Sequence, residues 1–314
     1  MARFVAALIA ALVLVPLRSG AQSVATLRIG YVPTDIGGQL FIAKDQGMFA
    51  RAGLSVELSP IINGSAIGAA IVSGSLDIGY SNPLSIVIAH DKGLPFVILT
   101  AANIYRADAP TVGQLVVLKS SPLKSGRDFA GKTVAVGGLN GLVHIAARAW
   151  IDQTGGDSSA TRFIEMSLPE MPAALRAGRI DAAMFNYGVD PGLGKPGDPF
   201  RVVADTFTSL SRNFAAGTWF TSSEWVAKHP ALARKFVAVM REAARWSDDH
   251  RREAMEIIAT NLKKSPEEMA AATPVAFGTT LSPAMIQPVI DAAAKYGVIK
   301  ARFPAQELLS RLAP

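Results

Sequence analysis

The stretch IINGSAIGAAIVSGSLDIGYSN, residues 61–82, decides the fold of this chain. It predicts the end of one strand, a turn, a helix and a second strand. Ser65 in the NGS turn is placed to cap the helix, and Gly74 suits the left-handed position just past the helix end. The segment LDIGY alternates like a short strand, and Ser81 and Asn82 form a small polar tip at its carboxyl end.

The same pattern returns 104 residues later, where AAIVSGSLDIGYSN (residues 69–82) becomes AALRAGRIDAAMFN (residues 173–186). Chance similarity in a chain rich in alanine and glycine is the alternative. The shared order of helix, glycine break, aliphatic-Asp strand and polar end favours two similar α/β units. In open α/β sheets, ligands bind beyond the carboxyl ends of the strands. We therefore expect two sheets that face each other across a cleft.

Strands alternate with helices along most of the chain. This order predicts largely parallel sheets with helices on both faces, followed by a helical C-terminal region. The predicted strands include residues 27–32, 54–58, 96–100, 114–118, 133–136, 163–166, 201–204 and 214–221, and the predicted helices include residues 40–53, 83–90, 230–250, 252–261 and 266–272, with a last helix capped by Ser282.

Composition limits the function classes. The 314 residues suggest two domains, 50% of them are hydrophobic, and 18% are charged, so a large core is available and disorder is disfavoured. The net charge is +6, but the positive residues are scattered, which gives little support for nucleic-acid binding. The absence of cysteine excludes disulfides, cysteine nucleophiles and cysteine zinc ligands.

Residues 1–21 have the pattern of a secretory signal. Arg3 precedes an apolar run, and Ser19 and Ala21 offer small residues for cleavage before Gln22. An uncleaved membrane anchor is the alternative, although the run is short for a spanning helix, which needs about 20 residues. We expect a cleaved signal and a mature protein located in the periplasm.

Two glycine-rich motifs resemble phosphate-binding loops, but their context is wrong. Gly126, Gly131, Lys132 and Thr133 fit G-x-x-x-x-G-K-[ST], yet a strand follows them where the motif needs a helix. The G-x-G-x-x-G match at 192–197 has no helix obviously following it. Neither motif predicts nucleotide binding.

No catalytic constellation emerges from the remaining polar residues. The four histidines are dispersed, and His144 could face the cleft, although a capping or surface role is favoured. Asp77 and Asp181 are a candidate carboxylate pair for general acid/base catalysis. Because both sit at the same place in the repeat, we expect a shared hydrogen-bonding role in the fold. We predict no enzyme activity, no metal and no cofactor.

Several polar loops precede helices and could converge on one ligand. Backbone N–H groups at a helix start lack partners and favour an anion. Ordinary connecting turns are the alternative for each loop alone. The loops are residues 33–38, 63–65, 81–82, 137–141 and 186–187.

The chain resembles the nitrate/sulfonate/taurine-type substrate-binding proteins of ABC importers. The resemblance covers nearly the whole mature chain and rests on several segments, each weak alone: LRIGYVP, KDQGMFARAGLSVEL, NGSAIGAAIVSGSLDIGYSN, DFAGKTVAVGG, AALRAGRIDAAMFNY, KHPALARKFVAVMREAARW and AAAKYGVIK.

This resemblance implies a periplasmic-binding-protein-like architecture with two lobes and two crossover hinge strands. Lobe one is expected at 24–113 and 217–314, and lobe two at 114–216. The lobes would close on a small polar, anionic or aromatic solute by a hinge motion. The closed form, expected to be a monomer, would deliver the solute to a membrane permease.

The resemblance also implies the ligand contacts. These are Thr34, Asp35, Ser65, Ser81, Asn82, Leu139, Asn140, Asn186 and Tyr187. Three features depart from the family pattern. GLNG at 138–141 replaces a Ser/Thr-rich turn, and FNYG at 185–188 replaces a Trp-acid-Pro sequence at the end of a strand. The negative charge of Asp35 disfavours binding of an anion. An aromatic, zwitterionic or neutral polar ligand is therefore an alternative to a simple oxyanion.

Two other functions use related scaffolds. A periplasmic enzyme would need a convergent acid, base or nucleophile in the cleft, and the sequence offers none. The effector domain of a transcription regulator would need an N-terminal helix-turn-helix, where this chain has an export pattern.

Overall fold

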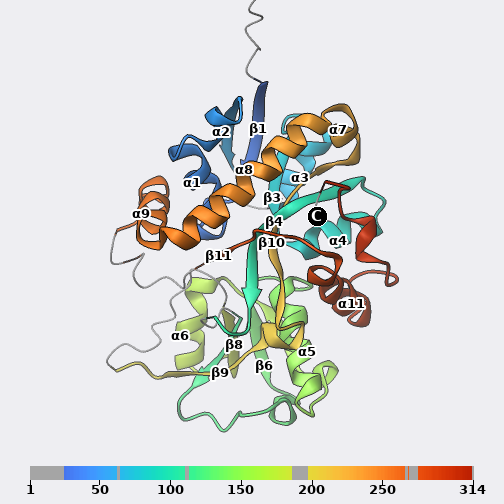
Figure 1. Cartoon of the computed structure of the whole chain (residues 1–314). Helices are drawn as coiled ribbons and strands as arrows, with labels where there is room; N and C mark the ends of the chain where they lie inside the picture. Colours follow the sequence, from blue (N-terminus) through green and yellow to red (C-terminus); the bar gives the residue numbers. More distant parts are fainter. Residues whose placement is uncertain are drawn as a thin grey trace, which may run out of the picture.

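The computed structural model describes residues 25–61, 64–109, 113–185, 197–265, 268 and 275–312. Two separate sheets, one of six strands and one of five, organise these residues. We call the six-stranded sheet with its helices lobe one, and the five-stranded sheet with its helices lobe two. Figure 1 shows lobe one above lobe two, joined by the long strands near the middle.

Lobe one has the strand order β11-β4-β10-β3-β1-β2. β1 pairs in parallel with β2 and β3, whereas β10 runs antiparallel to both β3 and β4. The strands are β1 (Ala25–Tyr31), β2 (Leu54–Pro60), β3 (Ile78–Ser81), β4 (Phe96–Arg106), β10 (Asn213–Ser222) and β11 (Ala276–Phe277).

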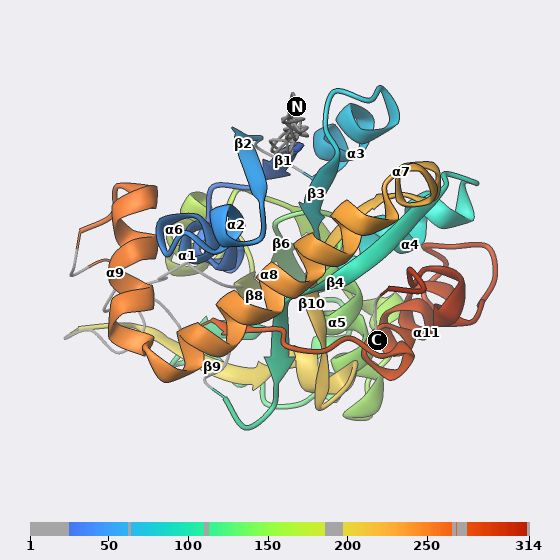
Figure 2. The same cartoon turned by 45° about the horizontal axis from the view of Figure 1, so that its top comes forward.

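Successive side chains of a strand point to opposite faces of the sheet, and here both faces carry apolar side chains. Helices cover both faces. Trp219 and its neighbours on one face pack against α1 (Gln39–Asp45), α2 (Met48–Arg51), α8 (Pro230–Asp249) and α9 (Arg251–Leu262). Phe220 and the other face pack against α3 (Gly64–Val72), α4 (Pro83–Asp91) and α11 (Gln287–Lys295). α7 (Ser223–Lys228) joins β10 to α8, which crosses the front of the sheet in Figure 2.

Lobe two repeats the central part of lobe one. Its order β7-β6-β8-β5-β9 matches β2-β1-β3-β10-β4, with the first three strands parallel and the fourth antiparallel to its neighbours on both sides. The strands are β5 (Gln114–Leu118), β6 (Thr133–Val136), β7 (Arg162–Glu165), β8 (Ala182–Phe185) and β9 (Phe200–Asp205), with α5 (Leu142–Gln153) and α6 (Met171–Arg176) on opposite faces.

The repeat extends to individual hydrogen bonds. Gly74 and Gly178 both adopt positive φ, at 74° and 64°. The residue after each glycine donates its N–H to the alanine carbonyl five residues earlier, at 2.9 Å in the first unit and 3.0 Å in the second. The two-unit interpretation of the sequence is therefore confirmed, and chance similarity does not explain it.

The two-lobe α/β fold is confirmed, with three differences in detail. Gly47 adopts a left-handed φ of 66° and splits the predicted helix over 40–53 into α1 and α2. β4 runs six residues beyond Thr100 because β10 pairs with it along its whole length. The strands β5 and β10 also make each sheet mixed, where the sequence predicted largely parallel sheets.

The C-terminal half is otherwise close to expectation, and α8 and α9 match the predicted helices within two residues. Ser282 precedes a short 3₁₀ turn, η6 (Pro283–Met285), and not the start of α11, which begins at Gln287. The helix predicted at 266–272 lies outside the described residues, apart from the single residue Glu268. None of the described helices is long and apolar enough to span a membrane.

Candidate functional site

The turn after β1 carries two polar side chains without internal partners. Thr34 is extended, with φ −137° and ψ 165°, and its Oγ1 is buried without a hydrogen bond among the described residues. Asp35 begins the 3₁₀ turn η1 (Asp35–Gly37) and is only 3% exposed. Its Oδ2 also lacks a described partner. Unpaired buried polar atoms cost free energy, so these two atoms are candidates for contact with a bound ligand.

Ser81 forms the matching feature at the end of β3. It is 2% exposed, and its Oγ is buried without a described partner. The N-terminus of α3 lies directly over it, because a Cβ added at Gly64 would come 2.5 Å from that Oγ. β1 and β3 are adjacent and parallel, so Ser81, the last residue of β3, and Thr34, shortly after β1, lie at the same edge of the sheet.

Ser65 lies inside α3 and does not cap it. The helix already begins at Gly64, which places Ser65 in the first turn as its second residue. The predicted cap is therefore wrong, because the backbone becomes helical one residue earlier than the NGS pattern suggested. Asn186 and Tyr187 fall outside the described residues.

Asn82 has a structural task. Its side-chain oxygen accepts the Ser85 N–H at 3.1 Å, and its amide donates to the Ser85 hydroxyl at 3.1 Å. It is the N-cap of α4, with Pro83 at the first helical position. Its amide is therefore engaged with α4, and replacing it would cost stability as well as any ligand contact.

In lobe two, two backbone N–H groups of the loop before α5 already donate hydrogen bonds to side chains. The Leu139 N–H donates to the Glu165 carboxylate at 3.2 Å, and the Asn140 N–H donates to His144 Nδ1 at 2.8 Å. Asn140 holds a left-handed φ of 58°. Leu139 and Asn140 thus lie at the predicted helix start, but their N–H groups are not free to cradle an oxyanion.

His144 closes this loop from the first turn of α5. The ring is 6% exposed and packs on Phe163, with centroids 4.5 Å apart. Because Nδ1 accepts a hydrogen bond, the proton of the neutral ring lies on Nε2, which has no described partner. Burial, aided by the charge of Arg148, lowers the pKa of His144 from 6.5 to about 4. A surface role is wrong because the ring is buried; the ring holds the loop before α5, whose N-cap Gly141 receives no side-chain hydrogen bond.

Asp77 and Asp181 share the structural role predicted from the repeat. Asp77 accepts the Arg28 N–H and Asp181 accepts the Thr133 N–H, each at 2.8 Å. Asp77 also binds the Arg28 guanidinium at 2.7 Å and the Trp225 indole at 3.1 Å. Burial acts to raise the pKa of Asp77, but the Arg28 hydrogen bonds outweigh it and hold the pKa below its ordinary value.

Two residues at these loops were not predicted from the sequence: Glu165, which binds the Leu139 N–H, and Gly64, which lies against Ser81. Glu165 ends β7, which runs parallel to β6, so its place at a strand end was a readable signal. In the sequence, Gly64 looks like an ordinary turn residue. Its role becomes clear only in the structure, where Ser81 lies against it. No cluster of three or more acidic or histidine residues able to hold a metal occurs within the described parts of the chain.

Residues 37–254, more than half of the chain, match the family described as NMT1/THI5 like. The formylaminopyrimidine-binding protein of Halalkalibacterium halodurans is 23% identical over 159 residues. That alignment covers 51% of this chain and 46% of the relative, so it spans about half the length of the relative.

Solved structures support the same fold at low sequence identity. The periplasmic aliphatic sulphonate binding protein SsuA from Escherichia coli superposes with a TM-score of 0.74 at 17% identity, covering 92% of this chain and 98% of SsuA. The periplasmic nitrate-binding protein NrtA from Synechocystis PCC 6803 gives 0.61 at 19% identity, covering 78% of this chain and 69% of NrtA. The resemblance to the fold of the sulfonate- and nitrate-binding proteins is confirmed.

Proposed function

Because the chain belongs to the NMT1/THI5-like family, we propose that it is an extracytoplasmic solute-binding protein of an ABC importer. It captures one small solute between the two lobes and releases it unchanged to a membrane permease. The named relatives are binding proteins for a formylaminopyrimidine, sulfonates and nitrate, which supports binding over catalysis.

One observation carries this proposal. The hydroxyls of Thr34 and Ser81 are buried and unpartnered at the ends of two neighbouring parallel strands, beside the N-terminus of α3. A polar solute bound there would supply the missing hydrogen bonds. The described residues near these atoms hold no nucleophile paired with a base, so the arrangement favours recognition.

The remaining parts of the proposal follow from the sequence. Residues 1–21 would export the chain to the periplasm, where it would act as a monomer. Lobe one would comprise 24–113 and 217–314, lobe two 114–216, and Ser65, Asn186 and Tyr187 would complete the contacts. No metal, cofactor or nucleic acid is part of this function. An enzyme on the same scaffold is the alternative.

The double variant Thr34→Val and Ser81→Ala tests the site. Each lost hydrogen bond is worth about 0.5–1.5 kcal/mol, so solute affinity should fall about five- to 140-fold in the double variant. Thr100→Val is the matched control, because Thr100 Oγ1 is also buried and unpartnered but lies inside lobe one, within β4. Calorimetric titration measures the solute affinity of both proteins. An equal loss of affinity in the double variant and in Thr100→Val would show that the site is not at the strand ends.

A further inference from the structure

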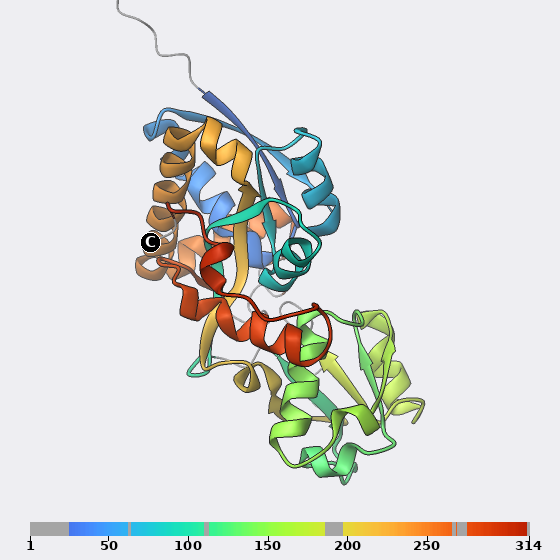
Figure 3. The same ribbon diagram turned by 90° about the vertical axis from the view of Figure 1, so that its right-hand side faces the viewer.

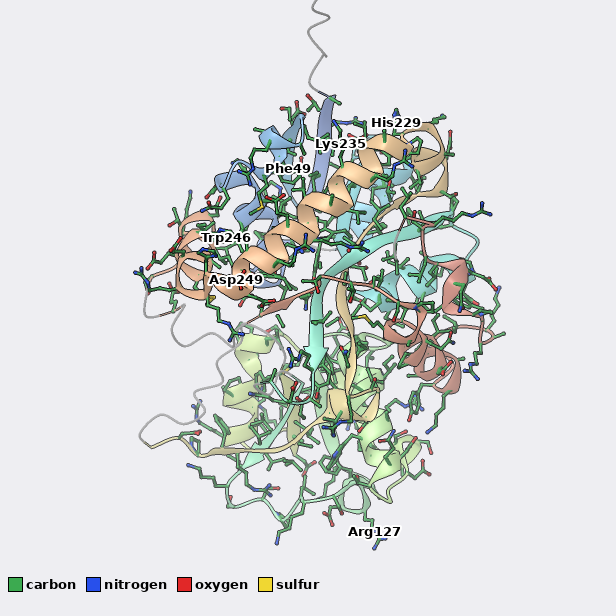
Figure 4. The ribbon with its side chains drawn as sticks, viewed as in Figure 1. Phe49, Arg127, His229, Lys235, Trp246 and Asp249 are labelled. Atoms are coloured by element: carbon green, nitrogen blue, oxygen red, sulfur yellow. The ribbon has the colours of Figure 1, made fainter. Side chains whose placement is uncertain are left out.

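A cavity of 390 Å³ opens beside Asp35, on the face of lobe one that carries α8 and α9. It lies between η1, the end of β4, β11 and the helices, and its volume is in the range of small-molecule sites, about 300–1,000 Å³. In Figure 4, Trp246 and Asp249 mark the end of α8 at which α9 begins. Ser247 and Asp248, which lie between them in the sequence, line the cavity.

The carboxylate of Asp35 is the unexplained group in this cavity. The side chain is almost fully buried, and Oδ2 receives no hydrogen bond from the described residues. An acid kept out of water needs a donor or a cation beside it. Neither arginine of the cavity wall supplies one, since no hydrogen bond or ion pair joins Asp35 to Arg106 or Arg251 within the described structure.

The charges on the wall favour a donor over an anion. Arg106 is already held by Asp108 through two contacts of 3.1 and 2.8 Å. Among the described residues that line the cavity, Arg251 is the basic residue left to balance Asp35 and Asp248. In lobe two, the loop donors that an oxyanion would need are taken by Glu165 and His144.

Part of the cavity wall is apolar. Ala254, Met255 and Ile258 come from α9, and Phe277 comes from β11. A solute with a compact hydrocarbon or aromatic body can bury itself there, with a gain of about 25 cal/mol for each Å² removed from water.

We propose that the cavity recognises a donor nitrogen on the imported solute, with Asp35 accepting its N–H and the α9 wall packing against its apolar body. The nitrogen belongs to an amine, an amidine or an amino-substituted ring. This inference rests on the proposed function and narrows its substrate class.

Three pairs of compounds test it, each differing in one donor nitrogen. The pairs are benzylamine and benzyl alcohol, 4-amino-2-methylpyrimidine and 2-methylpyrimidine, and taurine and isethionate. Thermal shift and calorimetry are run on the wild-type chain, on Asp35→Asn, and on Ala254→Leu, which fills the cavity. Asp181→Asn is the control, because it makes the same change far from the cavity.

We expect the nitrogen member of at least one pair to bind about tenfold more tightly in the wild type and in Asp181→Asn. That preference should vanish in Asp35→Asn, and binding should be lost in Ala254→Leu. A shift with none of the nitrogen compounds, or a preference that survives Asp35→Asn, overturns the inference.

The same data separate this inference from the proposed function. If probes bind equally to the wild type and Asp35→Asn but lose affinity in the Thr34→Val and Ser81→Ala double variant, the cavity assignment fails and the strand-end site stands. If binding depends on Asp35 and is unaltered in the double variant, the strand-end site fails and the cavity assignment stands.

Discussion

At the residue scale, the repeated aspartates provide a matched pair. Asp77 accepts bonds from Arg28 and Trp225 and its side chain is 12% exposed, whereas the Asp181 side chain is 39% exposed and 3.6 Å from Lys132. We predict that Asp77→Asn lowers the free energy of unfolding by about 1.5–3 kcal/mol, since it weakens charged hydrogen bonds. Asp181→Asn should cost less than about 1 kcal/mol, as exposed pairs usually do.

Urea unfolding followed by circular dichroism measures both costs. An equal cost at the two sites would show that the repeat alone, and not the Arg28 pair, determines the contribution of the aspartate.

His144 predicts a pH dependence. Its pKa is about 4 in the folded chain, below the ordinary value of 6.5, so the unfolded state binds more protons between these values. Stability from this residue is therefore complete above pH 6.5 and is lost as the pH falls toward 4, by about 2–3 kcal/mol. In His144→Gln this loss should be absent.

Chemical unfolding of both proteins at pH 7 and pH 4.5 tests the linkage. The other acidic groups titrate in both proteins, so only the difference between them reports His144. If the wild type and His144→Gln lose the same free energy, the ring is not held neutral by its burial.

At the element scale, the two helices of the repeat end in the same way. Gly74 and Gly178 adopt left-handed φ values, and an added Cβ would meet nothing within 4 Å at either position. Alanine there costs only backbone strain, and we predict a loss of about 1 kcal/mol in each case.

Gly138→Ala is the control for these two variants. Gly138 also has open space around an added Cβ, but it does not have positive φ, so the change should be neutral or slightly stabilising. Thermal unfolding compares the three variants. A similar loss at Gly138 would mean that the left-handed conformation is not the cause.

Local pattern predicts the strands and helices well in this chain. β5 and β6 have the predicted bounds, because alternation and flanking polar residues mark their ends. The break at Gly47 and the extension of β4 were missed, since both depend on contacts made by distant segments. Glycine between two helical stretches is compatible with either a continuous or a broken helix until the packing is known.

The candidate site shows the same limit. The family resemblance implied contacts at Thr34, Asp35 and Ser81, and all three carry unpartnered buried atoms. It could not show that Glu165, 26 residues from Leu139, takes the donor of that loop. The Asn-Pro pair at the start of α4 was a signal for an N-cap at Asn82. From the sequence, Asn82 was predicted only to contact the ligand.

At the scale of the whole molecule, α11 of lobe one bridges to α5 of lobe two. The Tyr296 hydroxyl donates to Asp152 at 2.9 Å, Arg148 donates to the Tyr296 carbonyl at 3.2 Å, and Lys295 lies 3.4 Å from Asp152. Burial raises the pKa of Tyr296. Figure 3 shows α11 running beside the connecting strands down to α5.

An apolar cluster continues this bridge. Ile145, Ala146 and Ala149 of α5 share one core with Ile290 and Ala293 of α11. The two lobes are therefore packed together along this side.

Native mass spectrometry of the mature chain, exposed to a cell extract and then desalted, tests the central claim most directly. The account predicts one small solute per chain, recovered from the denatured protein with its mass unchanged, and its loss in the Thr34→Val and Ser81→Ala double variant. A chain that carries no solute, or that converts the solute into a product of different mass, would contradict it.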